Sequence, residues 1–140
     1  MKKAAKGNVL TSTDVGAMRA GDAEISTHLM RTLENNLPVD VAVIPFYGNI
    51  SMQETGALFQ NADAVVGASG AGFANLVFSR PSTTVITYIS RAFFEFSTHM
   101  RAFPEGSHTG MALKLGMRPR LVIVENLERG FPFEEVCSAV

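Results

Sequence analysis

Residues 63 to 78, with the sequence DAVVGASGAGFANLVF, decide the fold. The segment Ala64 to Gly67 is a short apolar run typical of a buried strand. The glycines at positions 67, 70 and 72 predict a tight turn, and the apolar segment Phe73 to Phe78 predicts a short helix that Pro81 ends. A strand, a turn and a helix in this order form the first half of a βαβ unit. The glycine turn is therefore expected at the carboxyl end of a parallel strand.

Helices are predicted on both sides of the glycine turn. An apolar stripe at four-residue spacing predicts a helix over residues 22–36. Ser51, with a glutamate three residues later, forms a capping-box pattern and predicts a helix over residues 51–61. Helix is also expected within residues 93–115, and Pro132 is expected to begin a short final helix.

The remaining apolar segments predict the strands of one sheet. Residues 39–46, VDVAVIPF, are almost wholly apolar and are expected to form a central strand that is covered on both faces. Residues 84–89 and 121–124 predict two further strands. Residues 1–20 show no sustained periodicity and are interpreted as a loop or a disordered terminus. The prediction is an α/β fold, in which residues 21–140 form a single three-layer, Rossmann-like domain with a parallel sheet.

Composition limits the classes of function. The chain has 140 residues, with 12 basic and 13 acidic side chains and a formal net charge of -1, so no general attraction to nucleic acid is expected. The single cysteine, Cys137, excludes an internal disulfide and a cysteine-based metal cluster. The three lysines of residues 1–7 are not followed by an apolar run of signal-peptide length, and no stretch is apolar enough to span a bilayer. If the parent enzyme is secretory or membrane-anchored, we expect its targeting segment to be missing from this chain. The short length and an N-terminus without a predicted element lead us to expect a fragment of a longer enzyme.

The glycine turn is the strongest candidate for a binding site. Backbone N–H groups at the start of a helix, together with the helix dipole, bind anions such as a diphosphate. Gly70 and Gly72 lack a Cβ and allow a ligand to approach the backbone, and Ser69 and Asn75 offer side-chain hydrogen bonds.

Three other interpretations of the turn stay open at this point. The dinucleotide-binding pattern G-x-G-x-x-G is matched only weakly, although Arg91 after the next strand offers a charge for a ribose phosphate. A serine hydrolase is a further alternative, with Ser69 as the nucleophile; its acid would be Glu95 or Glu105 and its base His99 or His108. The third alternative is a purely structural crossing from strand to helix.

Residues 51–89 resemble the C-terminal conserved block of glycosyltransferase family 61. That block has a helix ending in phenylalanine, a strand with Ala-Asp, a turn of the form H-G-A-G, an N-L-x-F helix and a P-G-x-x-V-I-E segment. Weaker similarity continues over residues 98–124. The matching positions are Phe59, Ala62, Asp63, Val66, Gly67, Gly70, Ala71, Gly72, Asn75, Leu76, Phe78, Pro81, Val85 and Ile86.

The resemblance implies the C-terminal half of a two-domain enzyme of the GT-B type, in which this half grips the nucleotide of the sugar donor. It also implies an inverting transfer of a sugar from a nucleoside-diphosphate sugar to a glycan or protein hydroxyl, without a cofactor or a bound metal. The acceptor and the N-terminal domain of the same enzyme would be the partners. Eukaryotic relatives imply the Golgi lumen, and bacterial relatives imply cytoplasmic capsule synthesis. The predicted donor-binding residues are Gly67, Ser69, Gly70, Ala71, Gly72, Asn75, Thr87 and Arg91.

The chain departs from the family pattern at two positions. Ser69 stands where the family has the histidine before G-A, and Thr87 stands where it has an acidic residue. Serine replaces a charge-assisted hydrogen bond to a phosphate with a neutral one of roughly half the strength. A non-catalytic nucleotide-binding module, or a decayed relative, is therefore an alternative function.

Several other side chains have both a functional and a structural interpretation. Either His99 or His108 is a candidate to replace the missing histidine, although a surface position is favoured for both. His28 is expected at the border of the apolar stripe of its helix. Asp63 is expected to pair locally. Arg80, like Arg91, is a candidate to neutralise a diphosphate leaving group. The phenylalanines of the segment 93–103 are expected to pack in the core, although one ring could stack on a nucleobase; they are Phe93, Phe94, Phe96 and Phe103.

Overall fold

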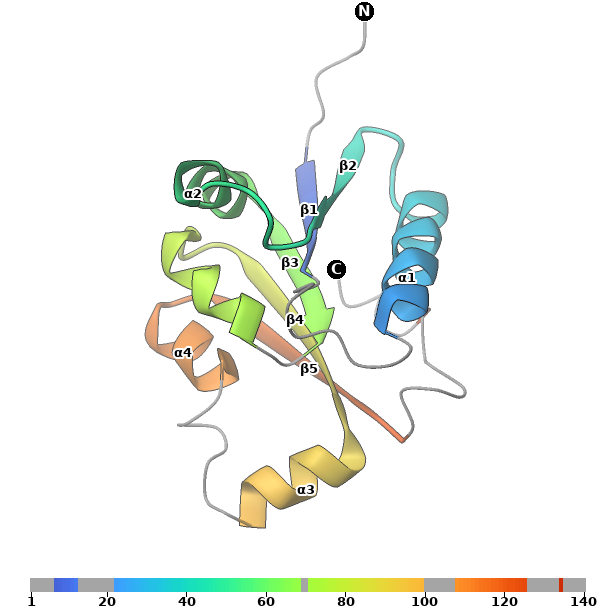
Figure 1. Cartoon of the computed structure of the whole chain (residues 1–140), viewed down its shortest axis with the longest axis vertical. Helices are drawn as coiled ribbons and strands as arrows, with labels where there is room; N and C mark the ends of the chain where they lie inside the picture. The colour runs from blue at the N-terminus through green and yellow to red at the C-terminus, as the bar shows by residue number, and fades with distance from the viewer. Residues whose placement is uncertain (1–6, 13–21, 69–70, 100–107, 126–133, 135–140) are drawn as a thin grey trace, which may run out of the picture.

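The computed structural model shows a five-stranded parallel sheet within the residues that it describes, which are 7–12, 22–68, 71–99, 108–125 and 134 (Figure 1). The strands are β1 (Gly7–Ser12), β2 (Val41–Phe46), β3 (Ala64–Ala68), β4 (Thr84–Ser90) and β5 (Arg118–Val124), and their order in the sheet is β2-β1-β3-β4-β5. Each neighbouring pair is parallel. The predicted α/β fold with a parallel sheet is confirmed.

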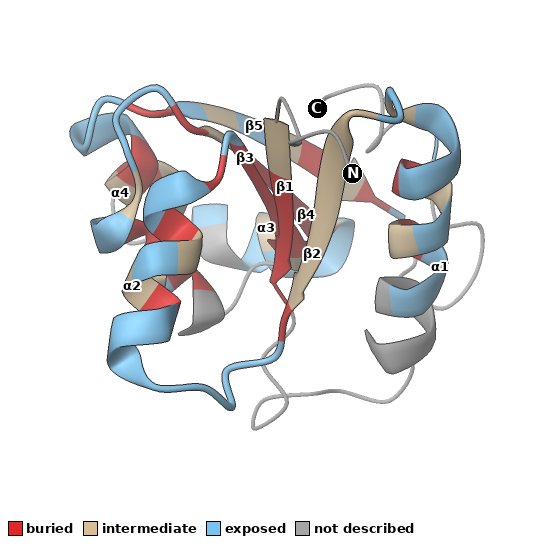
Figure 2. Cartoon of the chain, turned by 90° about the horizontal axis from the view of Figure 1, so that it is seen from above, coloured by how far each residue is buried: buried red, intermediate tan, exposed pale blue. Residues whose placement is uncertain are grey.

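Helices cover both faces of the sheet and make three layers. Helix α1 (Asp22–Asn36) lies on one face, and α2 (Met52–Asn61), the 3₁₀ helix η2 (Ala71–Phe78) and α4 (His108–Lys114) lie on the other (Figures 1 and 2). Helix α3 (Arg91–His99) follows β4 directly and projects beyond the carboxyl end of that strand (Figure 1). None of the described helices is both long and apolar enough to cross a membrane.

Each face of the sheet has its own hydrophobic core. On the α1 face, Leu29 and Leu33 pack with strand residues such as Val66 and Ile86. On the opposite face, Phe59 of α2 is fully buried and meets Phe46 edge to face, with ring centroids 5.1 Å apart. The alternation of side chains along β1 and β3 thus sends successive residues to different helical layers.

The expected loop over residues 1–20 is wrong for residues 7–12, which form β1. This strand lies between β2 and β3, and Val9 and Leu10 are buried on its two faces. The segment GNVLTS contains only two large apolar residues, so its periodicity is too short to detect. The burial of β1 comes from its neighbours in the sheet rather than from its own composition.

The expected central position of residues 39–46 is also wrong. Strand β2 begins at Val41, forms an edge of the described sheet and is largely half-buried. Pro45 within it has no N–H to donate, and proline in a sheet is confined mainly to edge strands and bulges. The proline was the signal for the edge position, against the apolar composition that favoured a central one.

The other predicted elements agree closely with the structure. The helices over 22–36 and 51–61 and the strands over 64–67 and 84–89 are confirmed within one residue at each end. Strand β5 begins three residues before the predicted strand 121–124, because its first half alternates exposed and half-buried residues. The segment 93–115 contains most of α3 and α4. The final helix predicted from Pro132 lies outside the described residues except for Glu134.

Candidate functional site

The order in which strands are added to the sheet changes direction between β1 and β3, which makes the carboxyl ends of these two strands a topological switch point. From β1 the chain passes through α1 to β2 on one side, whereas β3 lies on the other side and leads to η2 and β4. In open α/β sheets ligands bind outside the carboxyl ends of the strands at such a switch point. The residues that face each other there are Ser12 and Gly67, which are register partners. Predicted site residues Ser69 and Gly70 follow this point and lie outside the described residues.

Gly67 has a packing role at this point. A Cβ at position 67 would stand 2.6 Å from the carbonyl oxygen of Ser12 and 3.2 Å from the ring of Phe73. Real Cβ atoms do not approach a backbone oxygen that closely, so a side chain here would push β1 away from β3 or displace η2. The structure therefore supports the structural interpretation of this glycine and brings β1, β3 and η2 into close contact.

The 3₁₀ helix η2 begins with Ala71 and Gly72 at the carboxyl edge of the sheet. Phe73 and Leu76 are almost completely buried and anchor the helix against the sheet, while Asn75 is half-buried. The first N–H groups of a 3₁₀ helix have no partner within the helix. The predicted strand and helix start are thus present on either side of residues 69 and 70, with a 3₁₀ helix in place of an α-helix.

A row of register partners crosses the sheet below the turn. Ser12, Gly67 and Thr87 stand side by side on β1, β3 and β4. Each lies two residues beyond a member of the η2-side core, Leu10, Val65 and Val85, so all three face η2. Ser12 and Thr87 are 7% and 3% exposed. Ser12 was missed by the sequence analysis because its strand was interpreted as a loop.

Arg91 lies at the carboxyl edge, as expected, but it is paired. Its Nε donates a hydrogen bond to Oε1 of Glu125, which follows β5, at 2.6 Å. This bond, with the charge of Glu125, raises the pKa of Arg91 above its ordinary value. Both side chains are exposed, so the pair links the ends of β4 and β5 at the surface.

Arg80 does not lie at the carboxyl edge. Its Nη2 donates to Oδ1 of Asp63 at 2.8 Å and to the carbonyl oxygen of Ala62 at 3.3 Å. Oδ2 of Asp63 accepts a hydrogen bond from the backbone N–H of Asn8 at 2.8 Å. These groups join the amino ends of β1, β3 and β4. The expected local pairing of Asp63 is confirmed, and the structure places Arg80, which was one candidate to neutralise a diphosphate, at the opposite edge from the glycine turn.

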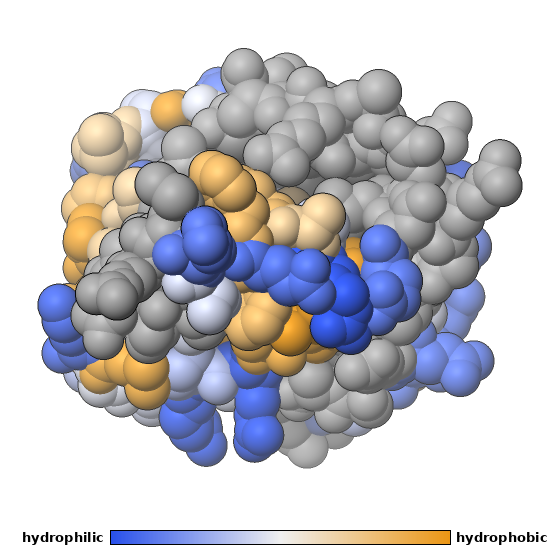
Figure 3. Space-filling view, turned by 90° about the horizontal axis from the view of Figure 1, so that it is seen from below, coloured by the Kyte–Doolittle hydropathy of each residue, from blue (hydrophilic) through white to orange (hydrophobic). Residues whose placement is uncertain are grey.

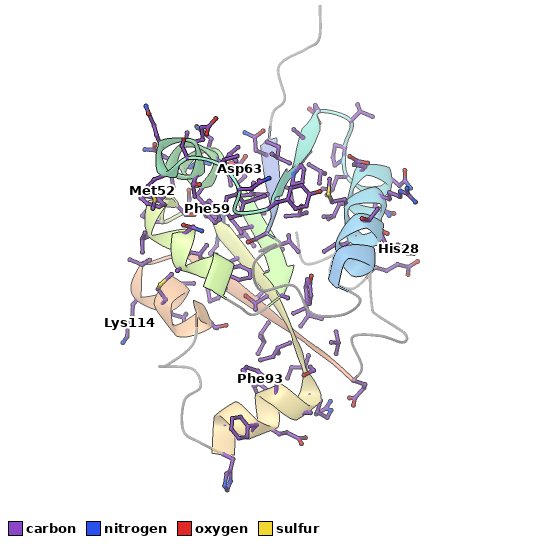
Figure 4. The ribbon with its side chains drawn as sticks, in the orientation of Figure 1. His28, Met52, Phe59, Asp63, Phe93 and Lys114 are labelled. Atoms are coloured by element: carbon purple, nitrogen blue, oxygen red, sulfur yellow. The ribbon has the colours of Figure 1, made fainter. Side chains whose placement is uncertain are left out.

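The aromatic residues of α3 lie mostly at the surface. Phe93 and Phe96 are 42% and 60% exposed, so the expected core packing is wrong for these two rings, whereas Phe94 is half-buried. In Figure 4 Phe93 and Asp63 lie at opposite ends of the molecule. Figure 3, which looks onto the carboxyl edge, shows hydrophobic and hydrophilic residues side by side on the described surface. Phe103 lies outside the described residues.

The histidines and the hydrolase residues proposed from the sequence are not brought together by the described part of the structure. His28 and His99 are exposed on α1 and α3. The hydrolase alternative stays a hypothesis because Ser69, Glu105 and the side chain of His108 are not described; labelling of Ser69 by a fluorophosphonate would test it. Within the described residues no three His, Cys, Asp or Glu side chains gather as metal ligands do. Cys137 lies beyond the described ranges.

A structure of a diflavin flavoprotein from Nostoc sp. is similar to this chain in fold. The TM-score is 0.60, the sequence identity is 9%, and the match covers 99% of this chain and 90% of that chain. At this identity the likeness shows the fold alone. No curated protein matches the sequence.

A family model gives the comparison that bears on function. Residues 26–86 match the model described as Glycosyltransferase 61. The matched segment runs from α1 to β4 and contains β2, α2, β3, the glycine turn and η2. This match confirms the resemblance to glycosyltransferase family 61 and suggests a glycosyltransferase activity.

Proposed function

We propose that the chain supplies the donor-binding domain of a glycosyltransferase that transfers a sugar from a nucleoside-diphosphate sugar to a hydroxyl of a glycan or protein. The observation that carries the proposal is the coincidence of the family match with the switch point. The matched segment contains the glycine turn, and the strand before that turn, β3, is one of the two strands that meet at the switch point, where open α/β sheets bind ligands.

In this proposal the diphosphate lies against the glycine turn and the first residues of η2. The N–H groups of Ala71 and Gly72 stabilise the negative charge on the leaving nucleoside diphosphate, and the side chains of Ser69 and Asn75 donate further hydrogen bonds to it. Arg91 adds a positive charge at the same edge. Thr87 and Ser12 lie on the sheet, on either side of Gly67, and face η2.

The reaction would be a direct displacement with inversion at the anomeric carbon. A base deprotonates the acceptor hydroxyl, the resulting oxygen attacks the anomeric carbon, and the bond to the nucleoside diphosphate breaks. We expect a second domain, of the kind found in GT-B enzymes, to provide that base and the acceptor. The present residues bind and orient the donor.

Ligand-observed NMR with UDP, GDP, CMP and NADP tests the donor site. We expect one nucleoside diphosphate to bind, and we expect the Gly72→Asp variant to lose that binding because a carboxylate would repel the phosphates at the start of η2. Ala57→Asp is the matched control, since it places the same charge at an exposed position of α2. Absence of binding to every nucleotide would sink the proposal and leave the turn as a structural crossing.

A decayed, non-catalytic relative is the second candidate, because Ser69 and Thr87 depart from the family pattern. Thr87 is only 3% exposed, so its side chain is buried between β4 and the helices that cover this face of the sheet. The variant Ser69→His restores the family residue. An increase in donor affinity or turnover would indicate a decayed site, whereas unchanged values would indicate that the site uses a different arrangement.

A further inference from the structure

Two neighbouring aromatic rings of α3 are exposed. Phe93 and Phe96 are 42% and 60% exposed, and side chains three residues apart in a helix lie next to each other. Among the other described side chains of α3, Phe94 is half-buried and the rest are exposed. Phe94 is thus the described residue by which the helix packs inward. The rings of Phe93 and Phe96, which we call the aromatic pair, are left facing outward.

The start of α3 is fixed at the end of β4. The helix begins at Arg91, directly after Ser90, which is the last residue of the strand. Oγ of Ser90 accepts a hydrogen bond from the backbone N–H of Phe93 at 3.3 Å, as the side chain of an N-cap serine does. The bond from Arg91 to Glu125 ties the same turn to the end of β5. Phe93 therefore has a defined position, which reduces the entropic cost of binding a ligand there.

The aromatic pair lies at the edge of the sheet where the glycine turn begins. Strand β3 ends at Ala68, whose register partner on β4 is Tyr88. Strand β4 continues for two more residues to Ser90, so α3 starts about 7 Å beyond the level at which β3 ends. Phe93 lies at this end of the molecule (Figure 4). A diphosphate at the turn would leave the base of a nucleotide one ribose further out, toward the level of α3.

The size and surroundings of the aromatic pair fit a small flat ligand better than a protein. A stable protein interface buries about 1,000 Å² or more, and two partly exposed rings offer only a fraction of that area. A nucleobase has an apolar face that stacks on aromatic rings and a polar edge that can form hydrogen bonds. The exposed polar residues on the same helix are Arg91, Glu95, Thr98 and His99.

We propose that Phe93 is the platform on which the nucleobase of the donor stacks, and that Phe96 extends the apolar surface beside it. The inference rests on the donor-binding function proposed above. It divides the donor between two neighbouring strands, because the diphosphate lies at the turn after β3 and the base lies on the helix after β4. Since every base has an aromatic face, the rings supply affinity and do not select the base.

Calorimetric titration of the full chain with UDP, GDP and inorganic pyrophosphate tests the stacking. We expect Phe93→Ala to weaken binding of the nucleotide that the wild type binds by about tenfold, within the range for one stacked base. Phe93→Leu keeps an apolar side chain without a flat ring and should also lose affinity, whereas Phe93→Trp should keep it. Pyrophosphate has no base, so its affinity should be equal in wild type and variants. Leu113→Ala in α4 is the control, because it truncates a different apolar side chain that is 55% exposed.

Ligand-observed NMR gives a second readout that a purely structural role of Phe93 would not change. Saturation transferred from the protein should be strongest at the base protons of the bound nucleotide, and Phe93→Ala should reduce it there relative to the ribose protons. Equal nucleotide affinities of wild type and Phe93→Ala would overturn this inference alone. If those equal affinities came with a wild-type dimer that Phe93→Ala dissociates, the aromatic pair would be a protein interface instead. A wild type that binds no nucleotide would overturn the inference together with the donor function.

Discussion

Gly67 in β3 approaches Ser12 in β1 so closely that a Cβ at position 67 would stand 2.6 Å from the Ser12 carbonyl oxygen. The contact lies at the end of both strands, where the family pattern begins its glycine turn. The lack of a side chain at Gly67 therefore allows β1 and β3 to pair closely at the point where the chain leaves the sheet toward the glycine turn. Packing and ligand binding make separate demands on the segment, and substitutions can separate them.

Gly67→Ala should destabilise the protein by about 3 kcal/mol, the upper part of the range for overpacked cores. The reason is that the methyl group meets a backbone oxygen and the buried ring of Phe73, neither of which can move aside freely. Urea unfolding followed by circular dichroism measures the change.

Gly56→Ala in α2 is the control for the same chemical change. The added Cβ would meet the ring of Phe78 at 3.7 Å, an ordinary contact distance. Because alanine is the better helix former, this variant should be about 0.5–1 kcal/mol more stable than the wild type. A Gly67→Ala variant as stable as Gly56→Ala would contradict the packing role of Gly67.

The start of α2 should show a pH-dependent stability. Oγ of Ser51 accepts a hydrogen bond from the backbone N–H of Glu54 at 3.1 Å, and Oε2 of Glu54 accepts from the N–H of Ser51 at 2.9 Å. Oγ of Ser51 also donates a hydrogen bond to Oε2 of Glu54 at 2.7 Å. The two bonds that this carboxylate accepts, first from the Ser51 hydroxyl and second from the Ser51 N–H, lower the pKa of Glu54 below its ordinary value near 4.5. A lowered pKa in the folded state means that the ionised carboxylate stabilises the fold above pH 4.5, and that this contribution disappears as the pH falls through the folded-state pKa.

Two variants test this cap. Ser51→Ala should lower stability at neutral pH by about 1 kcal/mol, the usual loss for an N-cap serine. Glu54→Gln should approach the wild type in stability as the pH falls below the ordinary carboxyl range, because the wild-type side chain is then neutral as well. Parallel stability curves at all pH values would show that the ionisation of Glu54 does not contribute.

The two arginines that flank β4 should have different effects on ligand binding. Arg91→Ala should weaken nucleoside diphosphate binding by about threefold, since an exposed charge contributes modestly. Arg80→Ala should leave affinity unchanged, because Arg80 pairs with Asp63 at the amino edge, and should lower stability by about 1 kcal/mol. Calorimetric titration measures the affinity of both variants, and thermal unfolding measures their stability. A loss of affinity in Arg80→Ala would contradict the placement of the ligand site at the carboxyl edge of the sheet.

The elements that the sequence predicts well are those with a local cause. Helix α2 begins at its capping box, and the strand and turn around Gly67 follow from a short apolar run and three glycines. Strand β1 could not be predicted in this way, because its position between β2 and β3 is decided by long-range pairing. The same pairing, not the apolar composition of VAVIPF, puts β2 at the edge.

The candidate site was predictable only in part for a related reason. In a parallel sheet the residues after a strand and those before it lie at opposite edges, so Arg91 and Arg80 are separated even though both flank β4. Thr87 and Ser12 become neighbours of Gly67 only through the register of three strands. No sequence spacing contains that register, and as long as β1 is not recognised as a strand the sequence does not show that Ser12 lies beside Gly67.

The aromatic residues offer a last test of which helices build the core. Phe59 of α2 is fully buried against Phe46, so Phe59→Ala should cost about 3–5 kcal/mol through the lost contacts and the cavity. Phe96 of α3 is 60% exposed, and Phe96→Ala should change the free energy of unfolding by no more than about 0.5 kcal/mol. Urea unfolding measures both values. A large loss in Phe96→Ala would mean that the exposed ring packs against another part of the chain, and α3 would then have to be counted as part of the core.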